Sequence, residues 1–486
     1  MQRGCPNWML VLGALVALYP VISFCIGRCL LERGQGCWLL ATYIAISVAI
    51  FRAALIVKSR TLVVLIFTVF FLVSFPLRIQ NVEANKELWM SGGGFATTAG
   101  FDFSEESYKI YYAVSLIGML GIFAGSGTGF YFLRHKKSQE WALNKKQLYL
   151  IFCVWIVLSL SLELICLRLN IGRSGVVQPN LPLHATGIIF HAKNSFLPML
   201  GWFIFSVAYE SGLARLKYWV VAAAFLMGLL SAYAMLSKAG LMYAVLPYLL
   251  YVCFRAPWDK ETRRLLSIGG LLLLIALPIV FFGAMVLREE AYNNWSGNRV
   301  EKLGEILDDH KVKSHGGVSL ISGTISNVFT RVTGGSELMG VIAASPQPED
   351  AIWRLLLGRG ASEESGTAEM IKAVYGVSVG IGSDTFTGKS FGLIPSLYLR
   401  HSLSMVLIGC FAYAFLVTIV EQYVRWKCSS GVAVGVAFWL AMRVWESGYD
   451  LLIQDPAVII TFCLLIGLTL KRRSNIPLQR PRTAAV

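Results

Sequence analysis

The chain has 486 residues, of which 56% are hydrophobic and only 15% are charged, and its mean hydropathy is +0.62. Because an average soluble domain carries about 25% charged residues, this composition excludes an ordinary soluble enzyme and indicates a chain solvated mostly by lipid. The formal net charge of +15 does not indicate nucleic-acid binding, because the basic residues stand in short clusters between apolar runs.

Apolar runs near 20 residues long recur along the whole chain, and each is long enough to cross a hydrocarbon core about 30 Å thick. Since lipid admits only helices or closed barrels, these uniformly apolar runs predict an all-α integral membrane protein with about twelve transmembrane helices. The first run, from Trp8 to Cys25, is longer than the apolar region of a secretory signal and is expected to stay as the first span. The predicted spans are 8–26, 37–57, 61–77, 108–132, 148–169, 185–208, 218–236, 239–254, 265–287, 402–422, 429–447 and 452–470.

Six basic clusters between these spans all fall on one side of the membrane. By the positive-inside rule that side is cytoplasmic, and both termini are then cytoplasmic as well. Arg28 and Arg33, in the first external loop, run against this pattern. The clusters are Lys58–Arg60, Arg134–Lys146, Arg215–Lys217, Arg255–Arg264, Arg425–Lys427 and Lys471–Arg473.

The same assignment divides the chain into three regions. Residues 1–287 hold nine transmembrane helices, residues 288–401 form one large periplasmic loop, and residues 402–486 hold the last three helices and a cytoplasmic tail. The loop mixes charged residues, glycines and weakly apolar patches, which predicts a few amphipathic or re-entrant helices over the membrane surface.

Ionisable residues at membrane depth are costly and therefore mark functional or structural sites. His191 and Lys193 lie near the outer end of the sixth span, beside Asn194. This polar group predicts either a water-filled cavity open to the outside or an interfacial anchor. On the fifth span, Glu163 and Arg168 are five residues apart and align poorly, and Arg168 is expected to reach the external interface.

Two further sites within the spans carry charge. Arg443 and Glu446 are three residues apart on one helical face and can neutralise each other, either as a structural pair or as part of an active site. Lys238 occupies a tight outward turn between two helices, where a cation binds phosphate or simply ends the helices.

Basic residues also approach the tenth span from the large loop. Arg331 falls on the polar face of a predicted helix, while Lys389, Arg400 and His401 lie before the span begins. A guanidinium fork suits diphosphate oxygens because it donates two hydrogen bonds at once. Interfacial arginine is also common as a headgroup anchor, so both interpretations stay open.

Several motifs of cofactor-dependent chemistry are missing from the sequence. It has no Walker loop, no dinucleotide fingerprint, no His and Cys cluster with metal-ligand spacing and no serine elbow in context. We therefore expect no metal and no cofactor, and the energy for any reaction has to come from an activated substrate.

The layout resembles the O-antigen polymerase family, which is related to the O-antigen ligases. The resemblance rests on the many spans, the late external loop, the Ser237-Lys238 turn, and the approach from Phe391-Gly392 through Leu397-Tyr398-Leu399-Arg400-His401 to Ile408-Gly409. It implies a GT-C-like architecture in the bacterial inner membrane and an oligosaccharide repeat unit linked to undecaprenyl diphosphate as substrate. It further implies a chain-length regulator as partner, and no nucleic acid.

Under this resemblance the enzyme orients an acceptor hydroxyl, removes its proton and stabilises the departing diphosphate. Arg331 and Arg400 are the expected diphosphate clamps, and Arg173, Lys238 and Lys389 are further contacts. The candidates for the base are His401, His191 and Glu337.

Two alternatives stay open. An O-antigen ligase uses the same donor and shares the layout. A flippase or secondary transporter explains the spans and the charges within them, but such folds are often built from repeated halves, and the single late loop has no counterpart in the first half of the sequence.

Overall fold

The computed structural model describes thirteen stretches of the chain, and only three of the described residues precede residue 100. They are residues 66–67, 75, 100–133, 141, 143–172, 179, 181–182, 185–235, 240–255, 259–292, 335–346, 392–446 and 454–470. The predicted spans 8–26 and 37–57, and nearly all of 61–77, lie outside the described residues.

Helices make up the architecture of the described residues, which confirms the all-α prediction for them. In chain order they are α7 (Glu105–Leu133), α8 (Lys145–Leu169), α9 (Ala185–His191), the π-helix η3 (Ala192–Phe196), α10 (Leu197–Glu210), α11 (Ala214–Met235), α12 (Gly240–Arg255), α13 (Lys260–Tyr292), α16 (Gly335–Ala343), α19 (Leu393–Tyr398), α20 (Leu403–Lys427), α21 (Ser430–Glu446) and α22 (Gln454–Thr469).

Six helical stretches among the described residues are long and apolar enough to cross a membrane, with α9, η3 and α10 forming one continuous stretch, Ala185–Glu210. Helices α12, α21 and α22 contain shorter apolar segments. All nine coincide with predicted spans from 108–132 onward, so the chain is a multi-pass membrane protein. The total of twelve spans stays a prediction.

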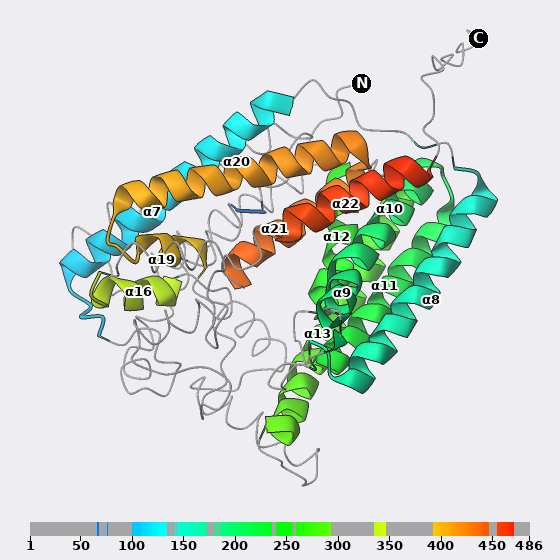
Figure 1. The fold of residues 1–486 in the computed structure, drawn as a ribbon, viewed down its shortest axis with the longest axis horizontal. Helices are drawn as coiled ribbons and strands as arrows, with labels where there is room; N and C mark the ends of the chain where they lie inside the picture. Colours follow the sequence, from blue (N-terminus) through cyan, green and yellow to red (C-terminus); the bar gives the residue numbers. More distant parts are fainter. Residues whose placement is uncertain are drawn as a thin grey trace.

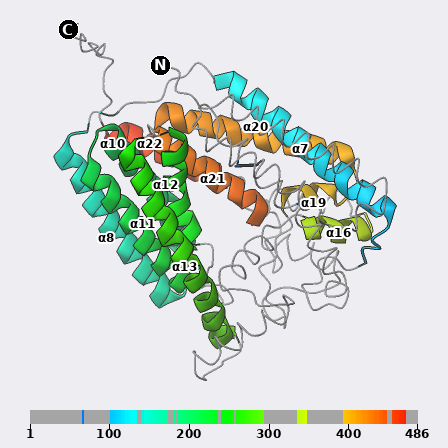
Figure 2. The same cartoon turned by 180° about the vertical axis from the view of Figure 1, so that it is seen from behind.

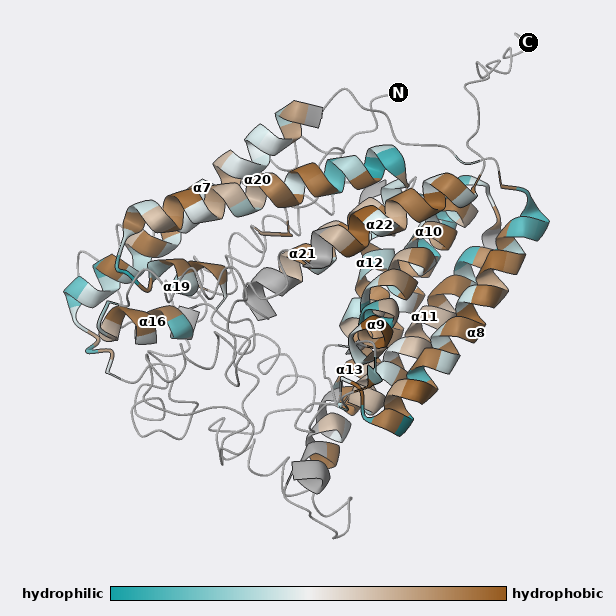
Figure 3. Cartoon of the chain, viewed as in Figure 1, coloured by the Kyte–Doolittle hydropathy of each residue, from teal (hydrophilic) through white to brown (hydrophobic). Residues whose placement is uncertain are grey.

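The helices form two groups that α21 joins (Figures 1 and 2). Helices α8, η3 and α10 to α13 pack as a bundle, while α7 and α20 lie along each other as a separate pair. Helix α21 contacts α10 and α12 of the bundle and also α20 of the pair. Hydrophobic residues predominate along the bundle helices (Figure 3). On α8, Leu150, Val157 and Leu164 are exposed, as expected for a surface that faces lipid.

Glycines hold α7 and α20 close together. Gly121, Gly125 and Gly129 are spaced by four residues, so they share one face of α7. A Cβ atom added at Gly125 would lie 2.1 Å from the Phe411 carbonyl oxygen, and one at Gly121 would lie 2.6 Å from the Leu407 carbonyl oxygen. Small residues at this spacing let two membrane helices approach backbone to backbone.

Two short helices, α16 and α19, lie in the segment 288–401, where the sequence predicts short helices on a large loop. Both lie against the α7–α20 pair, and they also contact each other. Helix α13 continues to Tyr292, past the end of the predicted span 265–287. The assignment of this segment to the periplasm stays a prediction.

Candidate functional site

A buried ion pair joins α8 to η3. The Lys193 ammonium nitrogen lies 2.8 Å from Glu163 Oε2, and the two side chains are only 4% and 10% exposed. Glu163 is six residues from the end of α8, or about 9 Å along the axis, and Lys193 is eight residues from the start of α9, or about 12 Å. The pair therefore lies well inside the helical bundle.

The π-helical turn η3 places Lys193 inside the bundle. Pro198, at the start of α10, has a ring that would clash with the Asn194 carbonyl of a regular α-helix, four residues earlier. A wider turn removes that clash, and single π-turns of this kind are frequent at functional sites. Within η3, Lys193 and Ser195 are buried.

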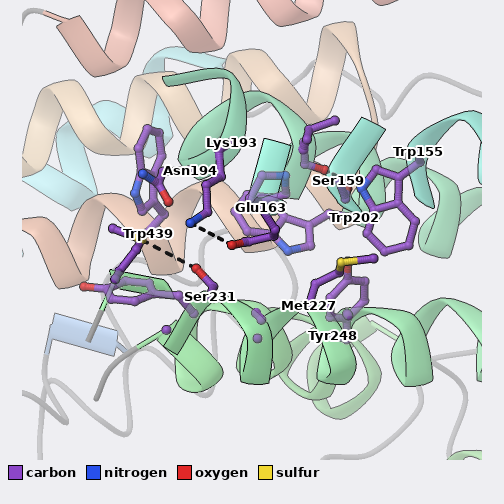
Figure 4. Close-up of a pocket in the computed structure, with 18 of the residues that line it drawn as sticks. Trp155, Ser159, Glu163, Lys193, Asn194, Trp202, Met227, Ser231, Tyr248 and Trp439 are labelled. Atoms are coloured by element: carbon purple, nitrogen blue, oxygen red, sulfur yellow. Dashed lines mark hydrogen bonds and ion pairs between the residues drawn. The ribbon is translucent and has the colours of Figure 1, made fainter. Parts of the chain in front are cut away.

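A cavity of about 240 Å³ surrounds the ion pair. Its walls come from α8, α9, η3, α10, α11, α12 and α21, and they include six aromatic side chains (Figure 4). The ion pair lies between Trp439 and Trp155, and Ser231 of α11 faces it. The aromatic lining residues are Trp155, Phe190, Trp202, Tyr243, Tyr248 and Trp439.

Some buried polar atoms at this cavity have a hydrogen-bond partner, and others have none among the described residues. The indole nitrogen of Trp155 donates a 2.8 Å hydrogen bond to the Leu197 carbonyl. By contrast, Trp202 Nε1 and Asn194 Nδ2 are buried and have no hydrogen-bond partner among the described residues. Since buried polar groups are nearly always paired, these atoms indicate a place for a polar molecule.

The second candidate site lies where α16 meets the start of α20. His401 Nε2 is 3.0 Å from the Val341 carbonyl oxygen, and because a carbonyl only accepts, Nε2 carries the proton. In a neutral imidazole the other nitrogen, Nδ1, is then the proton acceptor. The ring stacks on Tyr398, with centroids 5.2 Å apart, and burial raises the pKa of the Tyr398 phenol.

Arg400 and Glu337 belong to the same junction. Arg400 is exposed in the turn before α20, next to His401, whose backbone has a φ of 53°. Glu337 is buried on α16, one helical turn before Val341 and therefore on the same face of that helix. The structure thus places three of the predicted site residues at one junction.

The other predicted residues are placed elsewhere or lie outside the described residues. His191 is the last residue of α9, in the bundle, whereas α16 and α19 lie under the α7–α20 pair (Figure 1), so His191 is not brought to His401. Arg331, Arg173, Lys238 and Lys389 lie outside the described residues, as do the side chains of Arg443 and Glu446.

The pairing of Glu163 with Lys193 was not predicted from the sequence. The polar character of the Lys193 region predicts either a cavity or an interfacial anchor. The partner of Lys193 lies on another helix, and the rotation of one helix against another is not readable from one sequence. Arg168 is exposed in the last turn of α8, and its place at the external interface stays a prediction. The described residues contain no group of three or more His, Cys, Asp or Glu side chains arranged to hold a metal.

A scan of protein-family models, a search of curated proteins and a search of solved structures found no match to this chain.

Proposed function

We propose that the chain is a polymerase of lipid-linked oligosaccharide repeat units, with its reaction centre at the α16–α20 junction. One observation supports this most: His401 donates from Nε2 to Val341 and so presents Nδ1 as a base, directly beside the exposed Arg400. A base can accept the proton of the acceptor hydroxyl, and a guanidinium can stabilise the departing diphosphate.

In the proposed reaction an acceptor hydroxyl attacks the anomeric carbon of the growing glycan. The bond from that carbon to the undecaprenyl diphosphate oxygen breaks, and the hydroxyl proton passes to the base. Arg400 binds the departing diphosphate through two parallel hydrogen bonds, which stabilises the charge that develops on it. The lipid diphosphate leaves, and the next lipid-linked unit carries the longer chain.

His401 is the preferred base among the three candidates. Glu337 is buried, and His191 belongs to the other helix group. Arg331 and Lys389 are retained as proposed diphosphate contacts of this junction. Arg173 follows Gly172, which lies against Phe190 and Met235 of the bundle, and Lys238 stands between bundle helices α11 and α12, so neither is assigned to the junction. The enzyme is proposed to use no metal or cofactor and to act with a chain-length regulator on the periplasmic side of the bacterial inner membrane.

One observation favours a transporter as the second candidate. A buried Glu163–Lys193 pair at a cavity is typical of the ionisable groups that mark substrate or proton paths in membranes. An O-antigen ligase would use the same chemistry as the polymerase on a different acceptor.

Deletion of the gene in its native host separates these functions, because each leaves a different surface glycan on a gel. A single repeat unit on the lipid A core supports the polymerase. Complete loss of attached glycan supports a ligase or flippase. An unchanged ladder excludes the polymerase, the ligase and the flippase.

A further inference from the structure

The cavity around Glu163 and Lys193 contains hydrogen-bond donors that have no acceptor among the described residues. Trp202 is 5% exposed, lines the cavity, and has no partner for Nε1 among the described residues. Lys193 carries three N–H groups, and its only described polar partner is Glu163. An indole and an ammonium can only donate, so the complementary ligand must supply acceptor atoms, for which hydroxyl and ether oxygens are suited.

The net charge of the cavity selects an uncharged ligand. Among the described residues that line it, Glu163 and Lys193 are the only charged side chains, and they neutralise each other. A charged ligand would leave an uncompensated charge in a buried place, which is strongly unfavourable. Hydroxyl groups avoid this cost because they are neutral. They can also donate to the Glu163 carboxylate, and they can either donate to or accept from the Asn194 amide.

The walls and the size of the cavity further restrict which uncharged ligand can bind. Indole and phenol rings from α8, α10, α12 and α21 present faces that are electron-rich, and the C–H groups of a sugar ring, polarised by the neighbouring oxygens, pack well on such faces. The volume of about 240 Å³ is below the range of about 300–1,000 Å³ that holds drug-sized ligands. The space therefore suits one ring and not an oligosaccharide.

We propose that this cavity is a binding site for a single uncharged sugar ring. Ring oxygens and hydroxyls accept hydrogen bonds from Trp202 Nε1 and Lys193, and the ring carbons pack on the aromatic walls. The site uses none of the residues of the α16–α20 junction, so it can fail while the proposed function stands, and the reverse also holds.

Saturation-transfer NMR on the full-length protein in lipid nanodiscs tests the site directly. The probes are D-glucose, D-galactose and N-acetyl-D-glucosamine, with the open-chain sorbitol as a control for polyol binding. We expect ring C–H protons of at least one sugar to receive saturation from the wild type. Ser231→Phe, which fills the cavity beside the ion pair, should abolish the signal, whereas Ser161→Phe on the exposed face of α8 should leave it unchanged.

A Trp→Phe exchange tests the proposed donor. Trp202→Phe keeps an aromatic ring but removes the unpartnered N–H, so the affinity for the bound sugar should fall about fivefold, the size expected for one hydrogen bond. The matched control is Trp219→Phe, since Trp219 is 62% exposed on α11. The proposal is overturned if no sugar gives a signal, if sorbitol binds equally well, or if Ser231→Phe binds like the wild type. An unchanged affinity in Trp202→Phe overturns the assignment of the donor.

Discussion

Glu163 on α8 and Lys193 in η3 form an ion pair that links two neighbouring helices, with 2.8 Å between the carboxylate oxygen and the ammonium nitrogen. Each charge is buried, and among the described lining residues each is the only opposite charge for the other. The pair therefore couples the position of α8 to that of the π-turn.

Removing one partner of this pair should be more harmful than removing both. Lys193→Met or Glu163→Gln leaves one buried charge uncompensated, which costs about 3–5 kcal/mol in typical buried pairs. The double variant should recover much of that loss. Thermal unfolding of the four proteins in one detergent gives the coupling energy, and additive losses would show that the two charges do not stabilise each other.

The α7–α20 interface should not tolerate a side chain at Gly125. Gly125→Leu places a Cβ atom against the Phe411 carbonyl, and because this atom belongs to the backbone, the helices have to separate. We expect a loss of about 1–3 kcal/mol or more and a lower yield of folded protein in the membrane.

Gly127→Leu is the matched control on the same helix. A Cβ atom at Gly127 meets no atom of the described residues within 4 Å, so this variant should melt like the wild type. Equal stability of the Gly125 and Gly127 variants would contradict the close contact of α7 with α20.

The predicted orientation can be tested with two single cysteines in a cysteine-free background. Ser404 is exposed at the start of α20 and Lys145 is exposed at the start of α8, which lie on opposite sides in the predicted topology. A membrane-impermeant maleimide added to intact spheroplasts should label Ser404→Cys and not Lys145→Cys. The reversed pattern would move the α16–α20 junction to the cytoplasmic side.

The sequence predicts the helices well where both their composition and their ends carry a signal. Helix α8 begins with a capping box formed by Asn144 and Gln147 and ends at Asn170, whose φ is 55°, and the predicted span 148–169 matches it closely. An asparagine in the left-handed region commonly ends a helix. Local chemistry of this kind needs no knowledge of the tertiary fold.

Contacts between helices are harder to predict, since they depend on how each helix is rotated against its neighbours. The partner of Glu163 and the Gly125 contact both belong to this class, although the four-residue glycine spacing in α7 is a signal that could have been read. Similarly, Arg425 belongs to a predicted cytoplasmic cluster, but it is buried and paired with Glu421 within α20. Its burial depends on packing that composition does not reveal.

The candidate site was predicted in part. Arg400 and His401 were selected because they lie just before a span, and Glu337 was selected separately; the structure brings α16, which carries Glu337, to His401. Adjacent residues are brought together by the chain itself. The approach of α16, more than fifty residues earlier in the sequence, requires the folded structure.

Complementation of the deletion strain with site variants tests the central claim most directly. Wild-type protein should restore the full glycan ladder, and so should the control Leu403→Ala, which changes an exposed residue beside the site. Arg400→Ala should leave a single repeat unit on the core because the diphosphate clamp is lost. His401→Asn should do the same, because asparagine tolerates the positive φ but supplies no base. Both variants should be present in the membrane at the wild-type level, and a full-length ladder from either of them would contradict the account.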